Sequence, residues 1–81
     1  MVKDEANNII TINAQNLGCP MPILKLKKGL SIYAQAVEFE LLVTDLGAKK
    51  DVPAFCKQQG LDSEMQELNG ILIFKIKRVI S

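Results

Sequence analysis

One cysteine beside two closely spaced prolines is the feature of this sequence best suited to chemistry. The stretch Leu17-Gly18-Cys19-Pro20-Met21-Pro22 leads directly into an amphipathic segment, so the thiol lies where a helix is expected to begin. Proline suits the first turn of a helix, because its fixed φ is helical and its missing N–H would have no intrahelical acceptor there. With a helix from Pro20, Cys19 is predicted to be the N-cap. The positive end of the helix dipole stabilises an anion there, which predicts a lowered pKa for the Cys19 thiol.

The rest of the chain offers this thiol few chemical partners. There is no histidine, which excludes His-based acid–base catalysis and a Cys–His pair within the chain. The second cysteine, Cys56, is too far along the sequence to form a Cys-x-x-Cys redox pair or a zinc site with Cys19, so we expect no metal and no cofactor. Such a thiol can accept a group, hold it covalently and pass it on. Sulfur suits this role, because a persulfide is itself an anion.

Other interpretations stay open at this point. Cysteine is often a small apolar core residue, and this is our interpretation of Cys56, which follows Phe55 on the inward side of a predicted helix. The chain could also be a non-catalytic binding or regulatory module for RNA or protein. A net charge of +1 and an aromatic content of 5% argue against nucleic acid. A redox-sensing thiol is a third hypothesis, and it would form a sulfenic acid with peroxide.

Length and composition indicate one small globular domain. The chain has 81 residues, of which 48% are hydrophobic, and no apolar run is long enough to cross a membrane. Residues 1–8 are polar and carry no signal-peptide pattern, so we expect them to be a flexible segment before a single domain at 9–81. The expected compartment is the cytoplasm, where both thiols would be free.

Hydrophobic periodicity predicts two strands and two helices in alternation. Residues 9–14 and 37–44 alternate apolar and polar side chains, as half-buried strands do. A helix is predicted from Pro20 to Tyr33, with Gly29 weakening it by about 1 kcal/mol. A shorter helix is expected to begin with Asp51 as its N-cap and to end at Gly60, a natural C′ residue.

The C-terminal third of the chain is predicted to be a β-hairpin. Asn69-Gly70 favours a type I′ turn, which places Leu68 opposite Ile71 and Glu64 opposite Lys75. The element order is then β-α-β-α-β-β, an α+β fold in two layers with both helices on one face of the sheet. Five apolar side chains should lie on the uncovered face and indicate a weak homodimer or partner contact: Ile9, Leu42, Leu68, Ile71 and Ile73.

These residues resemble a known family. Leu17-Gly18-Cys19-Pro20-Met21-Pro22 is similar to the Cys-Pro-x-Pro signature of the TusA/SirA-like small sulfur-carrier proteins, and 51–56 (Asp-Val-Pro-Ala-Phe-Cys) is similar to a second segment of that family. The resemblance covers about residues 10–79. It implies a mixed four-stranded sheet in the order 1-2-4-3. It also implies that Cys19 carries a persulfide received from a cysteine desulfurase or related sulfurtransferase and relayed to an acceptor protein, as in tRNA thiolation, cofactor biosynthesis or sulfur metabolism.

The expected site therefore centres on Cys19, with Gly18, Pro20 and Pro22 shaping the start of the helix. Lys25 and Lys28 are candidate docking residues for an acidic partner. With Lys27, Lys49 and Lys50 they could form a basic rim around Cys19, although a solvated helix face is the simpler interpretation. Lysine and arginine side chains on the last strand are expected to keep the chain soluble or protect a sheet edge: Lys75, Lys77 and Arg78.

Overall fold

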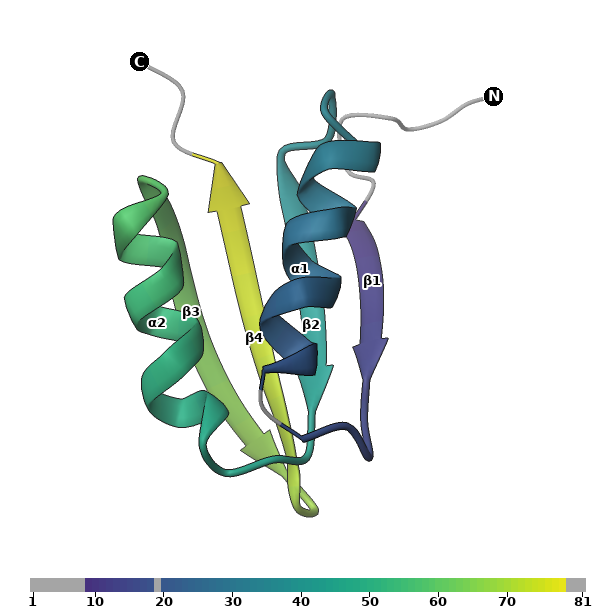
Figure 1. Ribbon diagram of the computed structural model, residues 1–81, viewed down its shortest axis with the longest axis vertical. Coiled ribbons are helices and arrows are strands. Elements are labelled where there is room, and N and C mark those ends of the chain that lie inside the picture. The colour runs from purple at the N-terminus through teal and green to yellow at the C-terminus, as the bar shows by residue number, and fades with distance from the viewer. Residues whose placement is uncertain (1–8, 19, 79–81) are drawn as a thin grey trace.

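The computed structural model describes residues 9–18 and 20–78. The two-layer α+β fold predicted from the sequence is confirmed, with two helices packed on one face of a four-stranded sheet (Figure 1). Its elements follow in the order β1 (Ile9–Ala14), α1 (Met21–Ile32), β2 (Glu38–Val43), α2 (Ala48–Gln58), β3 (Leu61–Leu68) and β4 (Ile71–Arg78).

The sheet has the order β1-β2-β4-β3. β1 and β2 run parallel because α1 connects them as a crossover, whereas β4 is antiparallel to both of its neighbours. The hairpin register is as predicted, with Leu68 opposite Ile71 and Glu64 opposite Lys75. Asn69 and Gly70 have φ values of 51° and 81°, the left-handed pair that a type I′ turn requires. Two consecutive residues of the sequence therefore fix the pairing of a whole hairpin.

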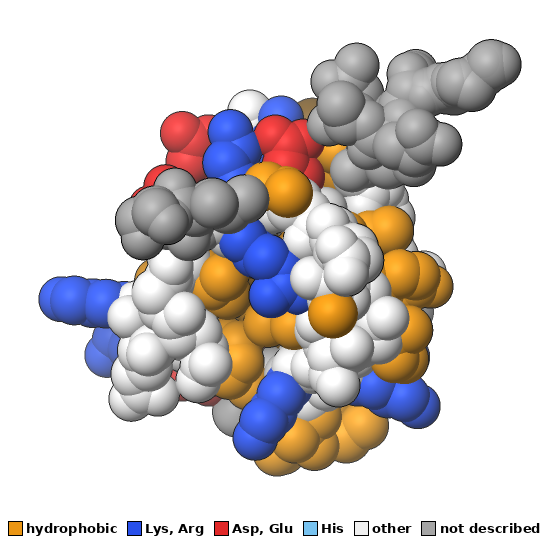
Figure 2. Space-filling model, turned by 90° about the horizontal axis from the view of Figure 1, so that it is seen from above, with side chains coloured by type: hydrophobic (Ala, Val, Ile, Leu, Met, Phe, Trp, Pro, Cys, Tyr) orange, Lys and Arg blue, Asp and Glu red, His pale blue; other side chains and the backbone are white. Residues whose placement is uncertain are grey.

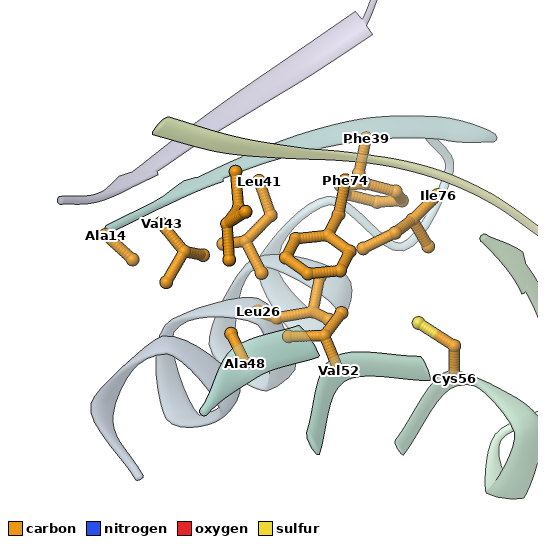
Figure 3. Close-up of a cluster of buried hydrophobic side chains, with 11 residues drawn as sticks. Ala14, Leu26, Phe39, Leu41, Val43, Ala48, Val52, Cys56, Phe74 and Ile76 are labelled. Atoms are coloured by element: carbon orange, nitrogen blue, oxygen red, sulfur yellow. The ribbon is translucent and has the colours of Figure 1, made fainter. Parts of the chain in front are cut away.

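The core lies between the sheet and the two helices (Figure 3). Phe39 and Leu41 of β2, Phe74 of β4, Leu26 of α1 and Val52 of α2 are all at most 1% exposed. Alternate residues of β2 and β4 point into this layer, so each strand contributes one apolar face. Leu26 and Val52 therefore anchor both helices to the sheet through this core.

The first residue of α2, like that of α1 at the candidate site, differs from the one predicted from the sequence. α2 starts at Ala48 with Gly47 as its N-cap, so Asp51 lies within the helix and Pro53 is internal. The amides of Ala48 and Lys49 donate to carbonyls three residues earlier, which starts the helix with tight turns before the α pattern is established. The predicted end was right, since Gly60 adopts a φ of 73° directly after the C-cap Gln59.

Arg78 has a different role from the one expected. β4 is a central strand, so its last residue protects no sheet edge. Its guanidinium donates hydrogen bonds to the carbonyls of Ala36 (2.7 Å), Leu30 (2.7 Å) and Tyr33 (3.2 Å), and it lies 5.3 Å from the centroid of the Phe39 ring. Arg78 therefore ties the C-terminal end of α1 to the sheet.

Candidate functional site

The loop that leads from β1 toward α1 is held by short-range and long-range hydrogen bonds. The backbone N–H of Gln15 donates to Oδ1 of Asn13 at 3.0 Å, which turns the chain at the end of β1. Asn16 takes a left-handed φ of 64°, and its N–H donates to the hydroxyl of Thr44 at 2.8 Å. Leu17 then packs against the core. The chain is thus fixed in place up to Gly18, directly before the candidate carrier residue.

The start of α1 differs from the prediction by one residue. The Leu24 N–H donates to the Pro20 carbonyl at 3.1 Å, the first bond of the α pattern, so Pro20 and not Cys19 is the N-cap. The Met21 N–H donates to the Gly18 carbonyl at 2.9 Å in a tighter turn. Pro22 is the second residue of the helix and is buried, whereas Pro20 is exposed.

The hydrogen bonds at the start of α1 limit which N–H groups could bind an anion there. Pro20 and Pro22 have no N–H, and the amides of Met21 and Leu24 are already bonded to carbonyls. None of these four residues therefore offers a free N–H to an anion. The helix dipole is the contribution to stabilising a thiolate or persulfide that the described residues of this turn provide. The two prolines fix the direction of the chain more than they provide donors.

Cys19, the predicted carrier, lies outside the described residues. Its neighbours Gly18 and Pro20 are both exposed. A Cβ built at Gly18 would meet no atom within 4 Å, so this position has open space around it. The N-termini of α1 and α2 and the β3–β4 hairpin all lie at the same end of the molecule (Figure 1). Two helix dipoles therefore direct their positive ends toward the end where the chain passes from Gly18 to Pro20.

Large exposed apolar side chains also gather at this end. Met21 and Leu24 in the first turn of α1 are 42% and 49% exposed, Leu46 before α2 is 63% exposed, and Leu68 at the hairpin is 60% exposed. They come from three segments that meet at one end of the fold (Figure 1). Exposed apolar side chains gathered at one end of a fold favour contact with a partner that excludes water.

The predicted basic rim is not one surface. Lys25 and Lys28 line a groove with residues of β1. Lys49 instead forms an ion pair with Glu67 of β3, with 3.5 Å between Nζ and Oε1. Since β1 and β3 are the two opposite edges of the sheet, these lysines face different sides of the molecule. Lys25 and Lys28 are the two lysines of the predicted rim that line this groove.

Cys56 lies where the sequence predicted, inside the core. It is 0% exposed, and its sulfur points from α2 toward the sheet (Figure 3). Burial raises the pKa of the Cys56 thiol, and a hydrogen bond with the Ser63 side chain opposes that shift in part. A buried thiol that holds its proton is a poor nucleophile, so Cys56 fills space in the core.

The uncovered face of the sheet divides into an apolar half and a charged half. Leu42 pairs with Ile73 toward the hairpin end. At the other end Lys77 lies between Glu38 and Asp62, and its Nζ is 3.5 Å from Oε2 of Glu38. Figure 2, seen from that end, shows acidic side chains on the sheet side with basic ones between them. Of the predicted apolar face, Leu42, Leu68, Ile71 and Ile73 lie in the half toward the hairpin, whereas Ile9 lies opposite Glu38 at the charged end. None of the helices formed by the described residues is long and apolar enough to cross a membrane.

Two residues that position the site were missed in the sequence. Thr44 holds the loop after β1 from the end of β2, and Arg78 holds the far end of α1. Asn13, one residue before the end of β1, was a local signal for the turn. No comparable signal marked Thr44 or Arg78, because each acts on a segment distant in sequence.

Comparisons with known proteins identify the family of this chain and agree with its fold. Residues 10–78 match the family described as Sulfurtransferase TusA. The chain is 38% identical over 68 residues to a sulfur carrier protein TusA of Allochromatium vinosum, covering 83% of this chain and 90% of that one. It is 41% identical over 63 residues to a putative sulfur carrier protein of Neisseria meningitidis, covering 74% and 85%.

A solved structure is similar as well. The crystal structure of a SirA-like protein from Desulfitobacterium hafniense superposes with a TM-score of 0.76 at 28% sequence identity, covering 84% of this chain and 95% of that one. A third relative, a putative sulfur carrier protein of Bacillus subtilis, is 37% identical over 68 residues. The similarity therefore extends over nearly the whole domain and includes both helices.

Proposed function

The chain belongs to the TusA family of sulfur carrier proteins, and on that premise we propose that Cys19 accepts sulfur as a persulfide and relays it to an acceptor protein. The observation that carries the proposal is the match over residues 10–78, which includes the Gly18-Cys19-Pro20 stretch. The donor is a cysteine desulfurase or a related sulfurtransferase. The chain supplies the carrying thiol and no further catalytic group.

The transfer is a thiol–persulfide exchange. The Cys19 thiolate attacks the terminal sulfur of the donor's persulfide, a new S–S bond forms at Cys19, and the donor's S–S bond breaks to release its thiolate. The terminal sulfur keeps its oxidation state, so no outside oxidant or reductant is needed. Delivery repeats the same step with an acceptor thiolate as the attacking group. A single thiol that reaches a partner's site is sufficient for both steps.

The geometry around Cys19 supports this role in three ways. The loop is fixed on one side by the bond from Asn16 to Thr44 and on the other by the bond from Leu24 to Pro20. The two helix dipoles favour an anion at this end. The exposed side chains of Met21 and Leu24 offer a partner an apolar surface in the first turn of α1. A partner that covers them would shield the persulfide from water and reductants.

Sulfur loading by a desulfurase tests the proposal. The chain is incubated with a cysteine desulfurase and cysteine, and its intact mass is measured with and without reductant. Wild type and Cys56→Ala should gain one sulfur that reductant removes, and Cys19→Ser should gain none. Equal loading of wild type and Cys19→Ser would overturn the assignment of Cys19. Loss of loading in folded Cys56→Ala would move the carrier role to the second thiol.

A further inference from the structure

The two edges of the sheet are protected very differently. β3, one edge strand, carries three acidic side chains, Asp62, Glu64 and Glu67. β1, the other edge strand, reads Ile-Ile-Thr-Ile-Asn-Ala and has no charged residue and no proline. Natural sheets normally prevent pairing at an edge with charges, prolines or bulges. Within the described residues, β1 pairs with β2 alone, so its outer side presents unpaired backbone groups.

A groove runs along this open edge. Four consecutive residues of β1, 10–13, line one side of it, and its volume is about 380 Å³. The other side is one stripe of α1, formed by Lys25, Lys28, Gly29 and Ile32, with Tyr33 beyond the helix. Consecutive residues point to opposite faces of a strand, so the groove follows the edge of β1 and not one face. Ile32 is 60% exposed and Tyr33 is 46% exposed, which leaves apolar surface at the far end of the groove.

We propose that the free edge of β1 binds an extended acidic segment of a partner protein as a fifth strand of the sheet. Backbone hydrogen bonds to β1 would supply the pairing, as in other β-augmentation complexes. Lys25 and Lys28 are exposed and form no ion pair with any carboxylate of the described residues. They lie one helical turn apart, about 4.5 Å along the axis. Alternate side chains of an added strand are about 6.8 Å apart, within reach of two flexible lysines.

The charges of Lys25 and Lys28 favour an acidic segment, and not a second copy of this chain, as the added strand. Two copies related by a two-fold axis and joined edge to edge through β1 would bring their α1 helices side by side on the same face of the sheet. Lys25 and Lys28 of one copy would then face the same lysines of the other, which is repulsive. A strand with acidic residues at alternate positions would instead be attracted to the same two lysines. The inference rests on the proposed sulfur relay for its need of a partner protein and gives Lys25 and Lys28 a docking role in it, but it does not depend on which thiol carries sulfur.

A synthetic peptide tests the proposal directly. The probe is a capped peptide of about eight residues, a usual strand length, that alternates glutamate with valine. It is titrated to millimolar concentration into the full ¹⁵N-labelled chain, both as wild type and as Cys19→Ser. We expect shifts of the β1 amides and slower hydrogen exchange of those that face the free edge. The Cys19→Ser protein should bind as wild type does, so failed sulfur loading and failed peptide binding can be told apart.

Matched variants separate strand addition from simple charge attraction. Lys25→Glu with Lys28→Glu should weaken binding about tenfold, and Lys27→Glu, on the same helix but outside the groove, less than about twofold. A peptide that is N-methylated at alternate backbone amides should not bind. A peptide with lysine in place of glutamate should bind the Lys25→Glu/Lys28→Glu variant more tightly than it binds wild type. The proposal is overturned by three results: no change at β1, equal binding of the methylated peptide, or a peptide-free dimer that already protects the β1 amides.

Discussion

The guanidinium of Arg78, at the end of β4, lies 2.7 Å from the carbonyl oxygen of Leu30 in the last turn of α1. The last carbonyls of a helix have no intrahelical donor, and a cation there also complements the helix dipole. α1 has no basic residue in its own last turn. The sheet therefore supplies, from Arg78, the cation that the helix lacks.

Replacing this arginine should destabilise the fold strongly. Arg78→Ala removes hydrogen bonds to Leu30 and Ala36 and the contact with the Phe39 ring, so we expect a loss of about 2–3 kcal/mol in the free energy of unfolding. Urea denaturation measures it. Lys77→Ala, one residue earlier, loses only an exposed ion pair and should cost less than about 1 kcal/mol. Equal losses in the two variants would contradict this role of Arg78.

What the sequence predicted well depended on local signals. Asn69-Gly70 determines its own turn, so the register from Leu68–Ile71 to Glu64–Lys75 was correct. The alternation of β2 was also sufficient to place Phe39 and Leu41 in the core. Such features need only neighbouring residues and the rule that one face of a sheet is buried.

What the sequence did not predict depended on distant contacts or on single backbone bonds. Arg78 looks like any basic residue of a strand until α1 is packed beside it. Lys49 and Lys25 look alike in sequence and lie toward opposite edges of the sheet. The N-cap of α1 depended on one hydrogen bond from Leu24 to Pro20. Cys19 itself lies outside the described residues, so its role rests on the family and on the residues around it.

A close contact between α1 and β1 gives a second prediction. Gly29 is buried, and a Cβ built there would lie 2.6 Å from Cδ1 of Ile12. Gly29→Ala alone should change stability little, because a helix gain of about 1 kcal/mol is offset by moving Ile12 off its rotamer, at about 0.5–1.5 kcal/mol. In an Ile12→Val background Cδ1 is absent, so the same change should stabilise by about 1 kcal/mol. The same effect in both backgrounds, measured by urea denaturation, would refute the contact.

The buried thiol predicts a pH dependence of stability. Burial raises the pKa of Cys56 in the folded chain above that of the unfolded chain, so the folded state holds this proton more tightly. The resulting stabilisation is fully present below the ordinary thiol pKa, about 8.5, and is lost as pH rises through the folded value. Between neutral and alkaline pH, wild type should therefore lose more unfolding free energy than Cys56→Ala. Other groups that titrate in this range are shared by both proteins and cancel in the comparison. Parallel curves would show that Cys56 does not hold its proton more tightly after folding.

The bond between Asn16 and Thr44 predicts an effect on sulfur loading. The Thr44 hydroxyl accepts the Asn16 N–H at 2.8 Å and so joins the end of β2 to the loop that precedes Cys19. Thr44→Val keeps the shape of the side chain but removes the acceptor, and we expect a loss of about 1 kcal/mol in stability. The initial rate of persulfide formation should fall several-fold, because the loop is less well positioned for attack on the donor's persulfide. Thr44→Ser keeps the hydroxyl and should load at nearly the wild-type rate. If the serine and valine variants load equally slowly, the side-chain methyl and not the hydrogen bond positions the loop.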